Sequence, residues 1–303
     1  MTLPHVLGPR IRLEVGGATD PGLQRSENQD SFLIADLSDP EGGSLRPSGD
    51  STGPWAREMD VGPRGVLLMV ADGMGGAAGG RVASKMATGH VLAFIAERWT
   101  RERGPSPERF IECIEEAVRA SNTLIHEQSA LHPAYRGMGT TATIAGVFED
   151  YLYLAQIGDS RAYLVREGSC TQLTSDQSFE SYAVEHGLMS PEEARRSDNR
   201  NMIFQALGPE SSVEADLTFQ QIRSEDVVVL CSDGLFRVVE ESEIAGAAGL
   251  EVADGCGRLV ALARERGAPD NVTVVLARCR GDGLRPPSAD DPVGRQPLPE
   301  WEG

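Results

Sequence analysis

Basic residues are scarce in this chain: Lys and Arg number 28 against 46 Asp and Glu, so the formal net charge is −18. Binding to a nucleic-acid backbone requires clustered Lys and Arg, and docking on an anionic membrane requires the same. We therefore expect no nucleic-acid partner and no membrane partner. A phosphate-bearing ligand would need local positive charge, which a bound metal ion can supply.

Cysteine and long apolar runs are also in short supply. The five cysteines are scattered, with no CxxC pair, so a disulfide framework is not expected. Cys231 ends an apolar run with no basic neighbour, and a buried core thiol is the better interpretation than a nucleophile. No run approaches the roughly 18 to 20 apolar residues of a membrane span, and the first residues lack a signal-peptide pattern. These absences predict a cytoplasmic protein.

The chain has ordinary globular composition, with 303 residues, 40% of them hydrophobic. Its length allows one large domain or two small ones with a sizeable core. Strands and helix pairs come in blocks rather than in βαβ alternation, which favours antiparallel sheets with helices packed outside. The predicted strands lie within residues 11–36, at 66–71, 140–148, 151–157, 162–166, 215–219, 226–232 and 271–279, and the predicted helices at 82–99, from Ser106-Pro107, near 240–248 and at 251–266.

Two segments have a composition typical of irregular structure. Residues 38–64 are rich in Gly, Pro and Ser and are predicted to be an inserted surface loop. Residues 281–303 carry many prolines and charges and are predicted to be a disordered tail. A third segment, 174–206, is polar and predicted to be helical in pieces, with a capping box beginning at Ser190.

Aspartates recur at the ends of the predicted strands. Asp72, Asp159 and Asp233 each follow an apolar run, whereas Asp30 and Asp270 each precede one. If these strands are neighbours, several carboxylates share one small space, so that either a pKa rises or a cation neutralises them. Oxygen-only ligands favour Mg²⁺ or Mn²⁺ over zinc. Each aspartate taken alone is more simply a turn residue, and it is their repetition that favours a metal site.

A glycine-rich passage follows Asp72 (residues 73–80, GMGGAAGG). It lacks the Gly-Lys-Ser/Thr ending of a nucleotide P-loop and a fitting GxGxxG with a downstream acidic partner. Close approach of the backbone to a metal is a better use of these glycines, with the carbonyl of Gly73 as an oxygen ligand beside Asp72.

Eight short motifs follow one another along the chain: 25–30 (RSENQD), 70–76 (VADGMGG), 137–141 (GMGTT), 158–163 (GDSRAY), 173–178 (LTSDQS), 206–208 (ALG), 231–235 (CSDGL) and 270–273 (DNVT). In this order and spacing they resemble the metal-dependent serine/threonine protein phosphatases (PPM, or type 2C) in their bacterial form. The resemblance implies an α+β fold, a four-layer α-β-β-α sandwich of two antiparallel β-sheets flanked by helix pairs. Residues 1–280 would form the catalytic domain, with 174–206 as the flap beside the active site.

The resemblance also implies roles for individual residues. Asp72 resembles the carboxylate that bridges two Mn²⁺ or Mg²⁺ ions, and the Gly73 carbonyl resembles a ligand of the second ion. Asp233 and Asp270 resemble the other ligands of the first ion, and Asp159 with Asp233 resembles the site of a weaker third ion. Asp30 resembles the acidic residue beside the second ion. Arg25 resembles the arginine that binds the substrate phosphate; pairing with Glu27 on the surface is the alternative.

The implied activity is hydrolysis of phosphoserine and phosphothreonine by a water that bridges the two metals. The implied partners are phosphorylated proteins, a Ser/Thr kinase and its substrates among them, and the family is mostly monomeric. Two departures matter: Gln29 stands where many members carry Glu, and Ala77 stands where many carry a proton-donating His. They motivate an alternative, a non-catalytic phosphoprotein-binding module on the same fold. A phosphatase for small phosphate esters is a third, weaker hypothesis.

Overall fold

Two antiparallel β-sheets form the centre of the protein in the computed structural model, which describes residues 10–39, 44–45 and 52–299. One sheet has the strand order β11 (Ser169–Gln172), β10 (Arg161–Arg166), β13 (Val227–Cys231), β14 (Val272–Arg280), β1 (Arg12–Asp20), β4 (Thr52–Asp60). The other has the order β15 (Gln296–Pro297), β12 (Asp216–Gln221), β9 (Tyr151–Ile157), β8 (Ala142–Phe148), β5 (Val66–Ala71), β2 (Ser31–Asp36), β3 (Ser44–Leu45). Every strand pairing in both is antiparallel, as the sequence predicts.

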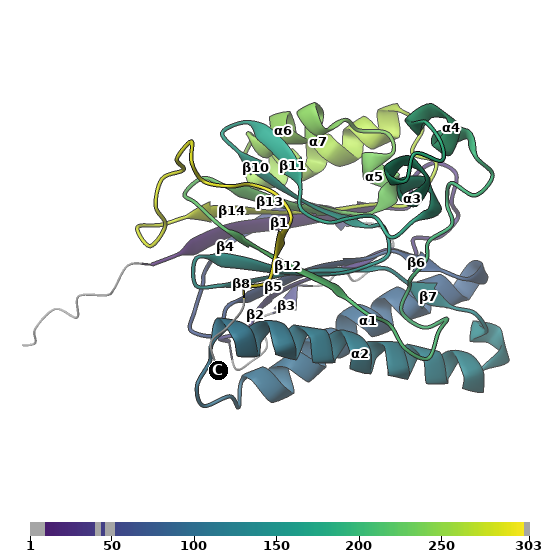
Figure 1. Cartoon of the computed structure of the whole chain (residues 1–303), viewed down its shortest axis with the longest axis horizontal. Helices are drawn as coiled ribbons and strands as arrows, with labels where there is room; N and C mark the ends of the chain where they lie inside the picture. The colour runs from purple at the N-terminus through teal and green to yellow at the C-terminus, as the bar shows by residue number, and fades with distance from the viewer. Residues whose placement is uncertain (1–9, 40–43, 46–51, 300–303) are drawn as a thin grey trace, which may run out of the picture.

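Helix pairs cover the outer faces of both sheets. The long helices α1 (Gly76–Trp99) and α2 (Pro107–Leu131) pack on the seven-stranded sheet, and α6 (Glu241–Ala248) and α7 (Val252–Glu265) pack on the six-stranded sheet. Figure 1 shows the four layers from top to bottom, with both sheets in the middle. This arrangement confirms the predicted α-β-β-α sandwich. Among the described residues, no helix combines the length and the apolar composition needed to cross a membrane.

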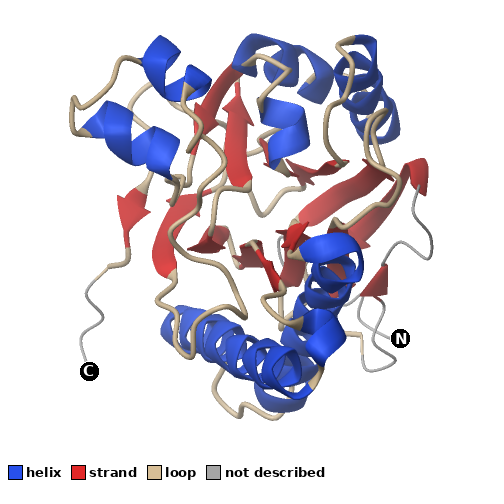
Figure 2. Cartoon of the chain, turned by 90° about the vertical axis from the view of Figure 1, so that its right-hand side faces the viewer, coloured by secondary structure: helices blue, strands red, loops and turns tan. Residues whose placement is uncertain are grey.

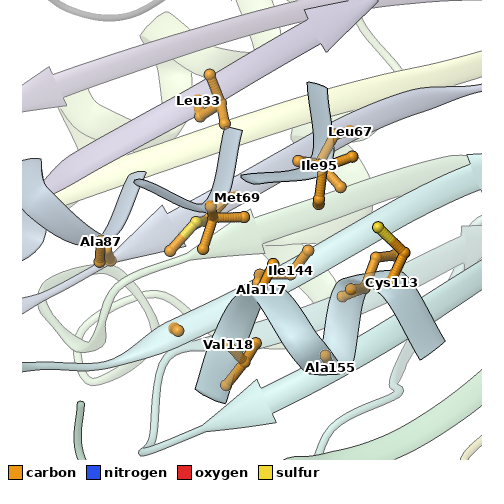
Figure 3. Close-up of a cluster of buried hydrophobic side chains, with 14 of the residues drawn as sticks. Leu33, Leu67, Met69, Ala87, Ile95, Cys113, Ala117, Val118, Ile144 and Ala155 are labelled. Atoms are coloured by element: carbon orange, nitrogen blue, oxygen red, sulfur yellow. The ribbon is translucent and has the colours of Figure 1, made fainter. Parts of the chain in front are cut away.

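Three apolar layers hold the sandwich together. The central layer, between the sheets, includes Phe32, Leu68 and Val275. The layer beneath α1 and α2 brings Leu33 and Met69 from the sheet against helix residues such as Ile95 (Figure 3). Successive residues of a strand face opposite sides, so Phe32 and Leu33 serve different layers. Because these strands are buried on both faces, their sequences are continuous apolar runs.

The start of α2 is where the sequence places it. Ser106 is the N-cap, its hydroxyl accepts a hydrogen bond from the backbone N–H of Arg109, and Pro107 occupies the first helical position. Such a cap stabilises a helix by about 1 kcal/mol. The two predicted helices on either side of this cap, α1 and α2, form as an antiparallel pair. The helices predicted near 240–248 and at 251–266 are confirmed within a residue or two.

Part of the predicted loop 38–64 is instead a strand, so that prediction is wrong for residues 52–60. Strand β4 pairs with β1 along nearly its whole length at the edge of the six-stranded sheet. An edge strand tolerates proline because one side of its backbone needs no ladder bonds, and Pro54 lies in β4. Met59 is buried and Trp55 stacks beside Phe32. Residues 40–43 and 46–51 of the predicted loop lie outside the described residues.

The predicted disorder of the tail is also wrong for residues 281–299. Leu284 is buried in the central layer, and β15 pairs with the edge of β12. The charged residues that suggested disorder have partners: Asp291 accepts from Arg223 at 2.9 Å, and Arg295 pairs with Asp216. Composition alone misleads here because these partners lie far away in the sequence. Residues 300–303 lie outside the described residues.

One end of the sandwich carries the short elements. They are β6 (Gly73–Met74), β7 (Gly139–Thr140), the 3-10 helix η1 (Pro133–Tyr135), α3 (Phe179–Glu185), α4 (Pro191–Arg196) and α5 (Asp233–Phe236). Most of them lie at the right in Figure 1, and Figure 2 views the molecule from that side. The segment 174–206 contains α3 and α4 and is helical in pieces, as predicted.

Candidate metal and phosphate site

The predicted site residues gather around one cleft at this end of the sandwich. The cleft has a volume of about 690 Å³. Its lining includes Arg25, Asp72, Gly73, Asp159, Asp233 and Asp270, together with Arg200 and Asn201 from the segment 174–206. Asp30 is 4% exposed and lies among the buried residues beside this lining. The structure therefore brings together all the carboxylates that the strand-end pattern singled out.

Antiparallel pairing explains why these aspartates meet. Ser31 at the start of β2 lies opposite Ala71 at the end of β5, so Asp30 and Asp72 flank the same edge of the seven-stranded sheet. In the other sheet the end of β13 lies beside the start of β14, which brings Asp233 close to Asp270. In an antiparallel pair, the start of one strand neighbours the end of the next. Asp159 lies in the turn through which the chain passes from β9 to β10.

Backbone hydrogen bonds fix Asp72 in place. Its N–H donates to the hydroxyl of Thr141 at 2.9 Å, and its carbonyl accepts from the N–H of Thr141 at 2.8 Å and the hydroxyl of Thr140 at 2.9 Å. The next residue must be glycine, because a Cβ at Gly73 would lie 2.1 Å from the carbonyl oxygen of Gly80. The chain therefore passes close to the first turns of α1, as expected from the glycine-rich passage.

Asp30 is a buried carboxylate whose charge is only partly compensated. The hydroxyl of Ser232 donates to its Oδ2 at 2.7 Å, while its Oδ1 is buried and has no hydrogen-bond partner among the described residues. Burial raises the pKa of Asp30 to about 7, against the bonds from Ser232 and Thr273, and Asp233 and Asp270 add to the rise. Burial also raises the pKa of Asp72 well above its usual range, and the charge of Asp30 raises it further.

Two arginines contact the other three carboxylates. Arg25 donates from Nη2 to Oδ2 of Asp270 at 2.6 Å. Arg237 donates from Nε to Oδ2 of Asp233 at 2.8 Å and lies 3.6 Å from Asp159. Burial raises the pKa of Asp159 to about 7, the charge of Asp233 adds to the rise, and Arg237 opposes it. The arginines thus neutralise part of the negative charge that the cleft gathers.

The donor set fits a hard divalent cation. Oδ1 of Asp233, like Oδ1 of Asp30, is buried without a hydrogen-bond partner among the described residues. Such unsatisfied oxygens are costly unless a cation or proton meets them. Among the described residues, no three acidic, histidine or cysteine side chains already lie close enough together to hold a metal ion. Asp270 is bonded to Arg25, and Asp233 to Arg237. Asp30, Asp72, Asp233, Asp270 and the Gly73 carbonyl are the groups that could hold such ions.

Gln29, which stands where many members of the resembled family carry Glu, helps to join three elements of the fold. Its backbone N–H donates to Oδ1 of Asn271 at 2.8 Å, and its carbonyl accepts from the hydroxyl of Ser84 at 2.6 Å. These bonds tie the segment before β2 to the start of β14 and to α1. The side chain of Ala77, the second departure, lies outside the described part of the chain.

The sequence argument missed Arg237, Arg200 and Asn201. Arg237 carries the one usable signal, since it follows Asp233 by one helical turn, the spacing of an ion pair along a helix. Arg200 and Asn201 carry none, because the course of a polar segment around a cleft is set by contacts distant in sequence. Two of these are the bridges between Ser178 and Ile203 and between Gln177 and Phe204.

Comparison with known proteins agrees with this architecture. A family model described as protein phosphatase 2C matches residues 47–268. The serine/threonine protein phosphatase PstP of Mycobacterium tuberculosis is 42% identical over 212 residues, 70% of this chain and 40% of that protein. The protein phosphatase PhpP of Streptococcus pneumoniae is 33% identical over 212 residues, 69% of this chain and 84% of that protein.

A solved structure gives the same result. The catalytic domain of PstP in complex with 2 manganese ions matches with a TM-score of 0.69 and 36% identity, over 89% of this chain and 99% of that one. The chain spans only 40% of the length of the curated M. tuberculosis relative. The family match covers more than half of the chain. This chain belongs to the protein phosphatase 2C family.

Proposed function

We propose that this chain is a metal-dependent protein serine/threonine phosphatase that hydrolyses phosphoserine and phosphothreonine. The observation that carries the proposal is the cleft in which four of the strand-end aspartates and Arg25 meet, with Asp30 buried beside it. Two carboxylate oxygens there are buried and have no hydrogen-bond partner among the described residues. Membership of the protein phosphatase 2C family and the relatives named as serine/threonine phosphatases support it. The manganese complex of the PstP catalytic domain supports two Mn²⁺ ions as the cofactor. Mg²⁺ in their place, and a weaker third ion at Asp159 and Asp233, are implied by the family resemblance alone.

Each group of the site has a task in this proposal. Asp30, Asp72, Asp233, Asp270 and the carbonyl of Gly73 would hold the cations, and Asp159 lies beside Asp233. When bound, two divalent ions would supply a water of lowered pKa as the nucleophile and offset the charge of the phosphoryl oxygens.

Arg25 would bind the substrate phosphate. Its side chain is 57% exposed, and its planar guanidinium can bond two phosphoryl oxygens at once. Exchange of its contact with Asp270 for a phosphate would release that carboxylate toward a cation. Phosphate binding and cation binding would then support each other.

The partners in this proposal are phosphorylated proteins, among them a Ser/Thr kinase and its substrates. The proposed state is a monomer in the cytoplasm. The phosphoprotein partners and the monomer follow from the family resemblance, and the cytoplasm follows from the five scattered cysteines. The net charge of −18 disfavours nucleic acid and anionic membranes as partners.

The test is hydrolysis of p-nitrophenyl phosphate and of a phosphothreonine peptide, with EDTA or with millimolar Mn²⁺, by the wild-type protein and by Asp233→Asn. We expect Mn²⁺-dependent hydrolysis that Asp233→Asn lowers by about a thousandfold, because the variant loses an ionised ligand beside the proposed nucleophile. An unchanged rate in the variant would overturn the metal mechanism.

Two other results would favour the alternatives. A folded protein that binds Mn²⁺ and phosphopeptide without turnover would be the non-catalytic binding module that Gln29 and Ala77 suggest. Faster hydrolysis of small phosphate esters than of phosphopeptides, compared at equal concentration, would favour a small-molecule phosphatase.

A further inference from the structure

Arg237 contacts three carboxylates from three separate parts of the chain. Its Nε donates to Asp233 at 2.8 Å, its Nη1 donates to Glu180 at 3.2 Å and its Nη2 lies 3.6 Å from Asp159. All three guanidinium nitrogens therefore face an acidic group. Asp233 begins α5, Asp159 lies between β9 and β10, and Glu180 lies in the first turn of α3.

The surroundings of Arg237 restrict it to this position. Its side chain is 23% exposed, and its guanidinium carbon lies 5.9 Å from the centre of the Phe236 ring. Arg161 stacks on the same ring at 3.8 Å and pairs with Asp176, at the start of the segment that carries α3. A planar, permanently charged fork is the side chain best suited to join several carboxylates.

Arg237 uses one oxygen of Asp233 and leaves the other. Oδ2 accepts from Arg237, whereas Oδ1 is buried without a partner among the described residues. A cation held by Asp233 through Oδ1 is compatible with Arg237. A cation shared between Asp159 and Asp233 is not, because it would need the space and the carboxylate oxygens that the guanidinium faces, and two cations there would repel each other.

We propose that Arg237 is a positioning residue that serves as the built-in cation of the Asp159–Asp233 pair. It keeps a metal ion out of that pair and, through Glu180, ties α3 to the cleft. The exclusion of a metal ion rests on the metal-binding part of the proposed function. The tie to α3 exists in the protein without any metal.

The first test counts the Mn²⁺ ions bound at saturation by equilibrium dialysis. We expect Arg237→Ala to bind one ion more than the wild-type protein, and the double variant Arg237→Ala/Asp159→Asn to return to the wild-type number. Asp159→Asn alone should leave the number unchanged. Two results would overturn the proposal that Arg237 excludes a metal ion. One is an equal number of bound Mn²⁺ ions in the wild-type protein and Arg237→Ala. The other is a smaller number of bound Mn²⁺ ions in Asp159→Asn than in the wild-type protein.

The second test is amide hydrogen exchange of residues 179–185 in EDTA. We expect exchange there to be about tenfold faster in Arg237→Ala and in Glu180→Gln, because each removes a hydrogen bond between charged groups. Glu180→Gln leaves the contacts of Arg237 with Asp159 and Asp233 intact, so its Mn²⁺ count should stay that of the wild type. Unchanged exchange in both variants would overturn the tie to α3.

Two further variants keep these tests decisive. Arg237→Lys retains the charge but not the three-way fork, so it should exclude the extra Mn²⁺ while α3 exchanges faster. Arg280→Ala is the matched control: Arg280 also pairs with two carboxylates, of Glu14 and Glu225, but at the opposite end of β14. It should alter neither readout. A protein that binds no Mn²⁺ at all would refute the proposed function, and the exchange experiment would still decide the tie to α3.

Discussion

Two arginines of the cleft, Arg25 and Arg237, bond to carboxylates but differ in their exposure to solvent. The Arg25 side chain is 57% exposed and bonds Asp270, itself 34% exposed. The Arg237 side chain is 23% exposed and faces Asp233, Asp159 and Glu180, of which Asp159 is 9% exposed. One arginine holds a single half-exposed carboxylate, while the other lies at the centre of three.

This difference separates an exchangeable cation from a fixed one. An exposed ion pair contributes only about 0–1 kcal/mol, so in the proposed function Arg25 would exchange Asp270 for a phosphate at little cost. Removing Arg237 would leave the buried Asp159 and the partly buried Asp233 without their cation, which is more costly. In the proposed function, the cleft would combine an exchangeable contact that binds substrate with a fixed contact that holds the site in shape.

Among the changes that test this comparison, the largest effect on catalysis should come from removing Arg25. We expect Arg25→Ala to lower kcat/KM for a phosphothreonine peptide by about 10- to 100-fold, the loss of a charged hydrogen-bonding group that contacts the phosphate. Steady-state kinetics at saturating Mn²⁺ measure it. Arg25→Lys should recover part of the loss, because it restores the charge without the fork. Equal kcat/KM in wild type and Arg25→Ala would contradict the role of Arg25.

An intermediate effect concerns Asp30, a carboxylate bonded to Ser232 instead of an arginine. Its pKa is raised to about 7, so it holds a proton below that pH, and a metal ligand must be ionised. The Mn²⁺ affinity should therefore weaken as the pH falls below 7, by about tenfold per pH unit for the proton on Asp30. Calorimetric titration between pH 6 and pH 8 measures this.

Asp30→Asn is the control for that titration. It should bind Mn²⁺ more weakly and with a shallower pH dependence, since the proton to be displaced is gone. An affinity for Mn²⁺ in the wild-type protein that stays constant from pH 6 to pH 8 would show that Asp30 is not titrated by metal binding.

The sequence predicts the carboxylates of the site because strand pattern and topology agree. Asp72 and Asp233 end apolar strands, Asp30 and Asp270 begin them, and antiparallel pairing places such ends at one edge. Their roles as ligands remain a prediction. The strand β4 was not predicted, because an edge strand has a weak pattern of its own and depends on its partner β1.

Arg237 shows what the sequence could not reveal. Its spacing to Asp233 is that of an ordinary helix surface pair, which is worth little. Its importance arises from Asp159 and Glu180, which reach it only after the two sheets and the segment 174–206 have assembled. The packing of residues 281–299 was missed for the same reason, since Arg223 and Asp216 lie far from their partners in sequence.

The smallest effect should be that of Arg25 on stability. We expect Arg25→Gln to change the free energy of unfolding in EDTA by less than about 1 kcal/mol, because its ion pair with Asp270 is solvated and screened. Arg237→Gln should cost more, roughly 1–3 kcal/mol, since Asp159 and Asp233 are then left without their cation; protonation of one of them limits the loss. Urea unfolding of both variants at pH 7.5 measures the contrast. Equal losses in the free energy of unfolding would mean that Arg237 is no more fixed in its contacts than Arg25. The difference in their exposure would then not distinguish their roles.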